Sequence, residues 1–169
     1  VIDKLIRKAL NNQLENKVYC MYISPIKALA NDIQKNLIKP LKEITERYLP
    51  HRAQDIRVGL RTGDTPQSER QKMLRKPPHI LITTPESMAI AIASKRFQPI
   101  VSSVEWLIID EISMVSARLL AEMDVKLKRV VRDVGTGNKD SEGQDKPFGG
   151  LNILFCGDFW QLEPPDGGF

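Results

Sequence analysis

Residues 104–111 read VEWLIIDE, a strand-like apolar run that ends in the acidic pair Asp110-Glu111. A buried strand with two carboxylates at its C-terminal end is typical of nucleotide hydrolases, in which the acids hold a magnesium ion and orient an attacking water. In such enzymes a separate glycine-rich loop holds the phosphates. No stretch of the 169 residues reads G-x-x-x-x-G-K-[ST], so the sequence contains the acidic half of such a site without the phosphate loop.

Upstream of this run, one local pattern occurs three times: an apolar strand, a Ser/Thr-Pro step and a helix. The strands are 18–23, 56–60 and 80–83; the steps are Ser24-Pro25, Thr65-Pro66 and Thr84-Pro85; the helices are 27–37, 67–74 and 86–93. Serine or threonine at an N-cap accepts a backbone N–H, and proline at the next position supplies the φ angle that a helix needs. We therefore expect three helix N-termini at the C-terminal ends of parallel strands, where ligands of such sheets bind.

Basic side chains accompany these junctions. Lys27, Arg57, Arg61 and Arg70 lie within or beside them, and residues 1–105 carry 18 Lys and Arg against 10 Asp and Glu, whereas residues 106–169 carry 7 against 11. Helix N-termini and basic side chains attract phosphate oxygens. A single junction is explained by capping alone, but three with basic neighbours favour a nucleic-acid surface, while the acidic half suits a divalent cation.

The remaining sequence suits one α/β domain. Residues 1–10 and 114–131 have helical spacing of apolar residues, 151–156 resembles a further strand, and the glycine-rich stretch of about 132–150 is predicted to be a flexible loop. Cys20 and Cys156 are predicted to be free buried thiols, and the two histidines carry no metal-ligand motif. With no apolar run long enough to cross a membrane and no signal peptide, we expect an intracellular protein, cytoplasmic or nuclear.

Two families of helicases share motifs with this chain. YISPIKALANDI (22–33), RTGDTPQSER (61–70) and ILITTPES (80–87), within residues of about 18–105, resemble the large-helicase-related group of superfamily 2 DEAD/DEAH-type helicases. LIIDEISMVSARLLAEMDVKLKRVVRD (107–133) and FGGLNILFCGDFWQL (148–162), within about 106–169, resemble the Pif-type DNA helicases of superfamily 1. The resemblances meet at Asp110-Glu111, which both families share, so the chain looks like a chimera with a seam near 106–113.

Each part departs from the other family's pattern. The superfamily 2 group is expected to have histidine where Ser113 stands, followed later by a Ser-Ala-Thr motif, and the Pif-type group is expected to have a T-A-P-T-G block and proline in place of Glu163. Both families use RecA-like P-loop NTPase domains with a parallel sheet. The resemblance therefore implies one partial RecA-like motor domain over residues 1–169, truncated because the phosphate-loop strand is missing. Its loss would expose a strand edge and apolar side chains.

The resemblance also implies roles for individual residues. Asp110 would bind Mg²⁺ through water, Glu111 would be the general base towards ATP, and Gln161, with Asp158, would sense the γ-phosphate. The residues implied to contact single-stranded DNA, with RNA left open, are Pro25, Lys27, Arg61, Thr62, Gly63, Asp64, Thr84, Pro85 and Trp160. Strand-end tryptophans are as often core residues, so Trp160 has two interpretations: stacking on a base or packing.

The expected function is that of a fragment of an ATP-dependent helicase. Activity would require a phosphate-loop segment and a second RecA-like domain as partners, so we expect the chain to be inactive alone, with weak or no binding of ATP and Mg²⁺. Two alternatives remain open: a non-catalytic module that binds single-stranded nucleic acid, and an artificial fusion without a stable fold.

Overall fold

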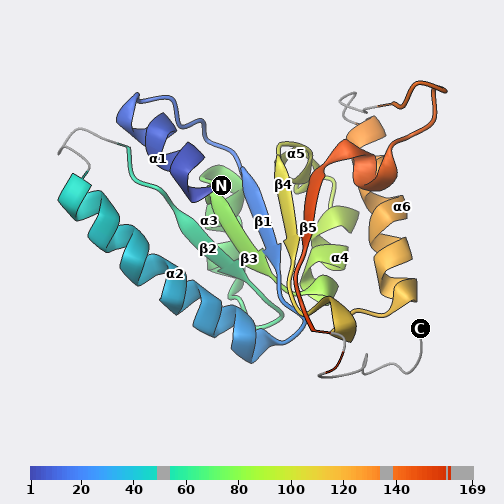
Figure 1. Ribbon diagram of the computed structural model, residues 1–169, viewed down its shortest axis with the longest axis horizontal. Coiled ribbons are helices and arrows are strands. Elements are labelled where there is room, and N and C mark those ends of the chain that lie inside the picture. The colour runs from blue at the N-terminus through green and yellow to red at the C-terminus, as the bar shows by residue number, and fades with distance from the viewer. Residues whose placement is uncertain (49–53, 134–138, 159, 161–169) are drawn as a thin grey trace.

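The computed structural model describes residues 1–48, 54–133, 139–158 and 160. In this part of the chain, five parallel strands form one sheet in the order β2-β3-β1-β4-β5, with helices on both faces (Figure 1). The strands are β1 (Cys20–Ile23), β2 (Val58–Arg61), β3 (Ile80–Thr83), β4 (Trp106–Ile109) and β5 (Asn152–Phe155). The helices are α1 (Ile2–Leu10), α2 (Lys27–Tyr48), α3 (Gln67–Arg75), α4 (Pro85–Ala93), α5 (Gln98–Ser102) and α6 (Ala117–Asp133), with 3-10 turns η1 (Ile112–Met114) and η2 (Pro147–Gly150).

Strand alternation divides the apolar residues between two cores. Along β4, Leu107 and Ile109 are fully buried with the apolar residues of α4, α5 and α6, while Trp106 and Ile108 contact the cluster that α1 and α2 form on the opposite face. Successive side chains of a strand point to opposite faces of the sheet, so a strand buried on both faces is apolar throughout. This explains why the strands appear in the sequence as short continuous apolar runs.

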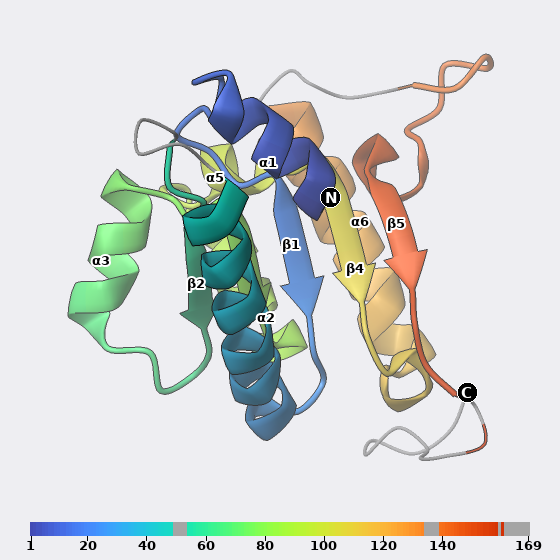
Figure 2. The ribbon, with the colours of Figure 1, turned by 60° about the vertical axis from the view of Figure 1, so that its left-hand side comes forward.

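One part of the sheet lacks a covering helix among the described residues. Helices α1 and α2 lie over β1, β2 and β3, whereas the same face of β4 and β5 is bare (Figures 1 and 2). Accordingly Trp106 and Ile108 are only partly buried, and Leu154 on the edge strand β5, which pairs with Ile108 on this face, is 50% exposed. Among the described residues, β5 is therefore an edge strand with an exposed apolar side chain, a feature that promotes pairing with a further strand.

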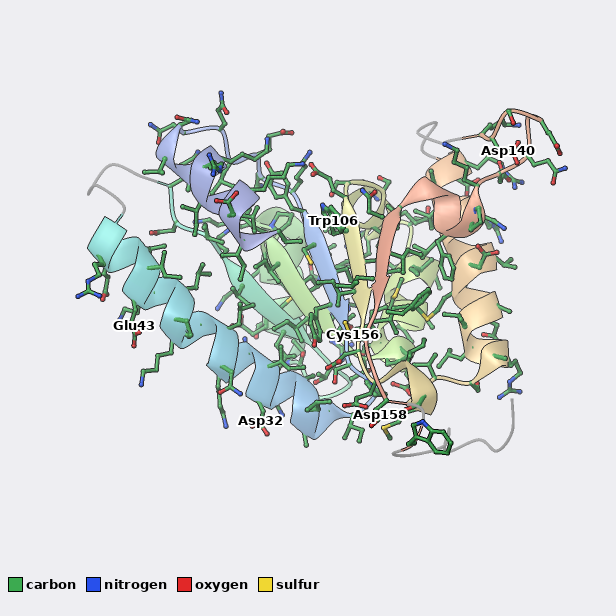
Figure 3. The ribbon with its side chains drawn as sticks, in the orientation of Figure 1. Asp32, Glu43, Trp106, Asp140, Cys156 and Asp158 are labelled. Carbon is green, nitrogen blue, oxygen red and sulfur yellow. The ribbon has the colours of Figure 1, made fainter. Side chains whose placement is uncertain are left out.

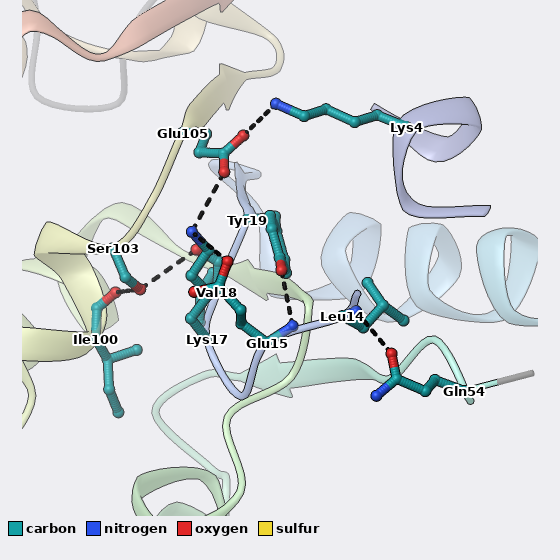
Figure 4. A network of polar contacts seen from close by, with 10 residues as sticks. All are labelled: Lys4, Leu14, Glu15, Lys17, Val18, Tyr19, Gln54, Ile100, Ser103 and Glu105. Atoms are coloured by element: carbon teal, nitrogen blue, oxygen red, sulfur yellow. Dashed lines mark hydrogen bonds and ion pairs between the residues drawn. The ribbon is translucent and has the colours of Figure 1, made fainter. Parts of the chain in front are cut away.

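Polar contacts attach α1 to the N-terminal ends of the central strands (Figure 4). The Glu105 carboxylate bridges Lys4 at 2.6 Å and Lys17 at 3.4 Å, and the Tyr19 hydroxyl accepts the backbone N–H of Glu15 at 2.9 Å. Burial disfavours ionisation of Glu105, but the two ammonium groups outweigh it and lower its pKa. The helix is thereby fixed beside β1 and β4.

The predicted elements are found with shifted boundaries. Each strand lies within its predicted run or one residue beyond it, but α2 continues past residue 37 and through Pro40 to Tyr48. Proline removes one helical hydrogen bond, and Asn36, whose carbonyl loses its donor, is exposed to water. Within the predicted loop of about 132–150, the described residues form a bridge between Lys139 and Asp145 and the turn η2. No helix in the described ranges is long and apolar enough to cross a membrane.

The three Ser/Thr-Pro steps do not behave alike. Thr84 is the N-cap of α4, since its hydroxyl accepts the N–H of Ser87 at 3.4 Å and Pro85 is the first helical residue. The caps expected at Thr65 and Ser24 are wrong. Thr65 Oγ1 accepts the N–H of Thr62 at 2.8 Å, and α3 begins after Pro66 without a side-chain cap. Ser24 Oγ donates to the Ile26 carbonyl, because α2 starts two residues after the proline.

Candidate nucleotide and nucleic-acid site

The acidic pair forms a turn at the C-terminal end of β4, held by both neighbouring strands. The backbone N–H of Asp110 donates to the Ile23 carbonyl of β1 at 2.9 Å. On the other side, Cys156, just after β5, accepts the N–H of Ile112 at 2.9 Å through its carbonyl. The turn is therefore fixed from both sides.

Glu111 has an unusual backbone conformation within this turn. Its φ and ψ angles of 47° and 51° lie in the left-handed region, which is uncommon for residues other than glycine. The carbonyl of Glu111 accepts the N–H of Met114 as the η1 turn begins. Such conformations persist where surrounding bonds enforce them, and they concentrate at functional sites.

Gly157 allows the end of β5 to approach the acidic turn closely. A Cβ at this position would lie 2.7 Å from the Ile112 nitrogen and 3.2 Å from Glu111 backbone atoms, and its φ of 150° is rare for residues with a side chain. Only glycine fits this contact without displacement. Gly157 thus belongs to the structure of the site, although it has no side chain to offer a ligand.

The Asp110 carboxylate is also contacted by β1. The Tyr22 hydroxyl donates to Asp110 Oδ2 at 2.7 Å. Burial raises the pKa of Tyr22, and the hydrogen bond to Asp110 raises it further, because both favour the protonated phenol. Asp110 Oδ1 has no partner among the described residues.

The donor set is compatible with Mg²⁺ bound together with a nucleotide. Magnesium usually retains several waters and takes one or two carboxylates, with substrate phosphates completing the octahedron. Asp110 and Glu111 are both partly accessible, and the described residues contain no group of three or more His, Cys, Asp or Glu that would form an all-protein cage. A single aspartate ligand acting through water fits this arrangement.

The residues after β5 lie at the same end of the strands as the acidic turn. Cys156 and Asp158 follow β5 at its C-terminal end (Figure 3). Asp158 is exposed, and its Oδ1 accepts the N–H of Trp160 at 3.0 Å. Trp160 is 96% exposed and does not pack against the described residues. Gln161 lies outside the described residues.

A second group of predicted residues follows the C-terminal ends of β1, β2 and β3. Lys27, in the first turn of α2, forms an ion pair with Asp64 in the loop after β2. A cleft of about 700 Å³ lies beside them, between α2 and α3. It is lined by Lys27, Thr62 and Asp64, by three further cations, Arg57, Lys72 and Lys76, and by Glu69, which forms an ion pair with Lys72. Three of the residues predicted to bind nucleic acid therefore share one basic cleft.

The other predicted nucleic-acid residues differ in accessibility. Gly63 is exposed and Pro25 half-buried, whereas Thr62, Thr84 and Pro85 are buried. For these three, contact with a ligand would involve the backbone or require movement.

Arg61 departs from the expectation of a surface cation. It is 8% exposed and its guanidinium lies 4.6 Å from the centre of the Phe97 ring. Burial, and secondarily the neighbouring Arg70, lowers its pKa. The last residue of β2 points into the molecule, and in this conformation Arg61 packs on an aromatic ring.

Sequence reasoning did not identify Tyr22 and Gly157 as residues of the site. They approach the acidic turn from β1 and from the end of β5, so their place there depends on the strand order. Ser113 was noted for its departure from a family pattern; its hydroxyl is buried and has no hydrogen-bond partner among the described residues. A glycine directly after a predicted strand was the one available signal, because such glycines often mark close backbone approaches.

A parallel α/β sheet with an acidic turn at the end of a central strand defines the class of RecA-like nucleotide-hydrolase domains. Residues 3–143 match the DEAD/DEAH box helicase family, and the chain belongs to this family. The match continues on both sides of residues 106–113, so the predicted seam and chimeric origin stay predictions.

Individual relatives agree with this assignment. The chain is 53% identical over 112 residues to the ATP-dependent helicase Lhr-Core of Saccharolobus solfataricus, covering 66% of this chain and 13% of that protein. The structure of Mycobacterium smegmatis helicase Lhr bound to ssDNA and AMP-PNP is similar with a TM-score of 0.66 and 30% identity, over 96% of this chain and 19% of that one. The ATP-dependent DNA helicase PIF1 of Saccharomyces cerevisiae is 38% identical over 58 residues, covering 34% of this chain and 6% of that protein. The chain thus spans a small part of each relative.

Proposed function

We propose that this chain is part of an ATP-dependent helicase motor that couples ATP hydrolysis to movement along single-stranded nucleic acid, and that it is inactive by itself. The observation that carries the proposal is the Asp110-Glu111 turn, held between β1 and β5 at the C-terminal ends of the strands, where Lys27, Thr62 and Asp64 of the cleft also lie. Lhr-type relatives are named as ATP-dependent helicases, and one was solved with ssDNA and AMP-PNP. We extend both properties to the longer protein that contains this sequence.

In this mechanism the acidic turn activates water. Asp110 would hold Mg²⁺ through water, and the ion would neutralise charge on the transferred phosphate. Glu111 would accept the proton of the attacking water as general base. Asp158 and Gln161 would report the state of the γ-phosphate, since they follow the strand beside the acidic turn.

The nucleic acid would lie along the C-terminal ends of β1, β2 and β3. There Lys27 and backbone groups of the loop of Thr62, Gly63 and Asp64 would contact the phosphates of the nucleic acid, with Pro25, Thr84 and Pro85 forming the adjoining surface. The exposed Trp160 is available to stack on a base, a contact worth about 1–3 kcal/mol. Both DNA and RNA fit such phosphate contacts, and single-stranded DNA is our first choice.

The phosphates of ATP would be held by a segment that precedes Val1 in the longer protein. Val1 and the start of α1 lie in front of the central strands (Figure 2), and Lys4 contacts Glu105. A preceding strand could pair with the free edge of β5, and a helix leading into α1 could cover Trp106 and Ile108. A second RecA-like domain would complete the site.

The test compares two proteins, this chain and a version extended upstream in its coding sequence. We expect single-stranded DNA binding without hydrolysis by the chain, and Mg-ATP hydrolysis by a longer protein that contains a G-x-x-x-x-G-K-[ST] loop and the second domain. Glu111→Gln should lower kcat of that protein by about 10²–10⁴-fold, the usual contribution of a general base. Binding should be unchanged.

The alternative is a non-catalytic module that binds single-stranded nucleic acid, supported by the basic cleft between α2 and α3. In that case the longer protein would bind DNA, and its slow background hydrolysis would be the same in the wild type and in the Glu111→Gln variant. An upstream coding sequence without a phosphate loop would also favour the module.

A further inference from the structure

Asp110 is attached to β1 by two hydrogen bonds, one from its main chain and one to its carboxylate. Its backbone N–H donates to Ile23 at 2.9 Å, and its Oδ2 accepts the Tyr22 hydroxyl at 2.7 Å. The two partners, Tyr22 and Ile23, are consecutive residues of β1. This strand pairs with β4 in parallel, with Tyr22 opposite Ile108. The aspartate is thus held at its main chain and at one side-chain oxygen.

The hydroxyl has a specific effect on how the carboxylate meets a cation. The phenolic donor takes up one lone pair of Oδ2 and leaves Oδ1 without a hydrogen bond from the described residues, so Oδ1 is the oxygen better placed to meet a cation. A carboxylate held in one rotamer also loses little conformational freedom when a ligand binds, whereas ordering a free side chain opposes binding. Both effects favour a single, defined contact to Mg²⁺ or to a water bound by it.

We propose that Tyr22 is a positioning residue for the magnesium-binding aspartate, acting through its hydroxyl on Asp110 Oδ2. The inference rests on the proposed function, because it assumes that Asp110 faces the ion. Tyr22 lies three residues before Pro25 on the strand that leads to the nucleic-acid surface. In this proposal, β1 both leads into the nucleic-acid surface and orients Asp110 of the nucleotide site.

The chain itself offers a matched control. Tyr19 lies immediately before the same strand, is fully buried, and has its hydroxyl on the N–H of Glu15 at the opposite end of β1. Tyr19→Phe and Tyr22→Phe each remove one hydroxyl from a hydrogen bond. Only Tyr22→Phe should affect Asp110.

The experiment uses the 169-residue chain labelled with ¹³C and ¹⁵N, and Mn²⁺ as a paramagnetic probe that detects weak binding. Three-bond couplings report the χ1 rotamer of Asp110, and broadening of nearby amides reports Mn²⁺. We expect one rotamer in the wild type and in Tyr19→Phe, and averaged couplings in Tyr22→Phe. Half-maximal broadening in Tyr22→Phe should need about 2–10-fold more Mn²⁺, the cost of ordering one side chain.

Asp110→Asn separates the two proposals. Persistent broadening around residue 110 in this variant would overturn the assignment of the metal to Asp110 and hence the proposed site. If Asp110→Asn abolishes the broadening but Tyr22→Phe behaves like Tyr19→Phe, the positioning role is wrong and the proposed function stands. Should Tyr22→Phe not fold, the exchange rate of the Tyr22 hydroxyl proton decides: it should be faster in Asp110→Asn than in the wild type, and equal rates would refute the contact.

Discussion

Gly157 is the residue whose replacement should disturb the acidic turn most directly. An added methyl group would lie 2.7 Å from the Ile112 nitrogen, so Gly157→Ala must displace either β5 or the turn. We expect a loss of about 1–3 kcal/mol in the free energy of unfolding, the usual range for overpacking and backbone strain. Urea titration would measure it.

Gly63 provides the control for this substitution. It is exposed, and an added Cβ meets nothing within 4 Å. Gly63→Ala should change stability by less than about 1 kcal/mol, with a gain as the expected sign because the unfolded chain loses freedom. Equal losses in the two variants would show that Gly157 is not under steric pressure.

His79 should make the stability of the chain depend on pH. It is 1% exposed, its Nδ1 accepts the N–H of Arg57, and burial together with the nearby Arg57 lowers its pKa to about 4. Histidine in an unfolded chain titrates near 6.5, so between these values the unfolded state binds more protons. The free energy of unfolding should therefore fall as the pH is lowered from about 6.5 to 4, by up to about 3 kcal/mol.

His79→Asn isolates this contribution. Asparagine retains an acceptor for the Arg57 N–H but does not titrate, and the carboxylates contribute equally to both proteins. Chemical unfolding at a series of pH values should show a smaller slope for the variant between about pH 4 and 6.5. Equal slopes for the wild type and the variant would mean that His79 takes up a proton as readily in the folded state as in the unfolded state.

At the scale of elements, the first turn of α4 depends on the Thr84 cap. Its hydroxyl accepts the Ser87 N–H and also bonds the Ser87 hydroxyl at 3.1 Å. Thr84→Ala should cost about 0.5–2 kcal/mol, because a buried helix N–H loses its acceptor. Thr45→Ala is the matched control: Thr45 lies inside α2 and bonds back to the Lys42 carbonyl, so alanine should be neutral or slightly stabilising there. Thermal melts of both variants would decide.

The same elements show where sequence reasoning succeeds. Strands buried on both faces are continuous apolar runs, so their positions could be predicted within about two residues. The helix caps could not be predicted in this way. Ser24 and Thr65 satisfy the Ser/Thr-Pro pattern, but their helices begin two residues and one residue after the proline. The acidic pair was predictable from its place at a strand end. Its contacts with Tyr22 and Gly157 were not, because they depend on which strands are neighbours.

At the scale of the molecule, the sheet combines a well-covered half with a bare one. Under α1 and α2, the strand residues Cys20, Ile80 and Ile82 are buried, whereas the same face of β4 and β5 has no covering helix among the described residues and β5 has one strand neighbour there. Exposed edge strands with apolar side chains promote pairing with other chains. The isolated chain is therefore expected to be less soluble than a longer protein whose preceding segment covers this half.

Leu154 lies at the centre of the bare half, 50% exposed on the edge strand and opposite Ile108 in the register. We expect the isolated chain to self-associate as its concentration rises, and Leu154→Lys to reduce this, since a charge on an edge strand opposes strand pairing. Ile90→Lys is the control, because Ile90 is 65% exposed on α4, away from β5. Sedimentation velocity over a series of concentrations should show a lower weight-average mass for Leu154→Lys alone. If the wild type stays monomeric throughout, or if both lysine variants act alike, the bare half of the sheet is not the surface through which the chain associates.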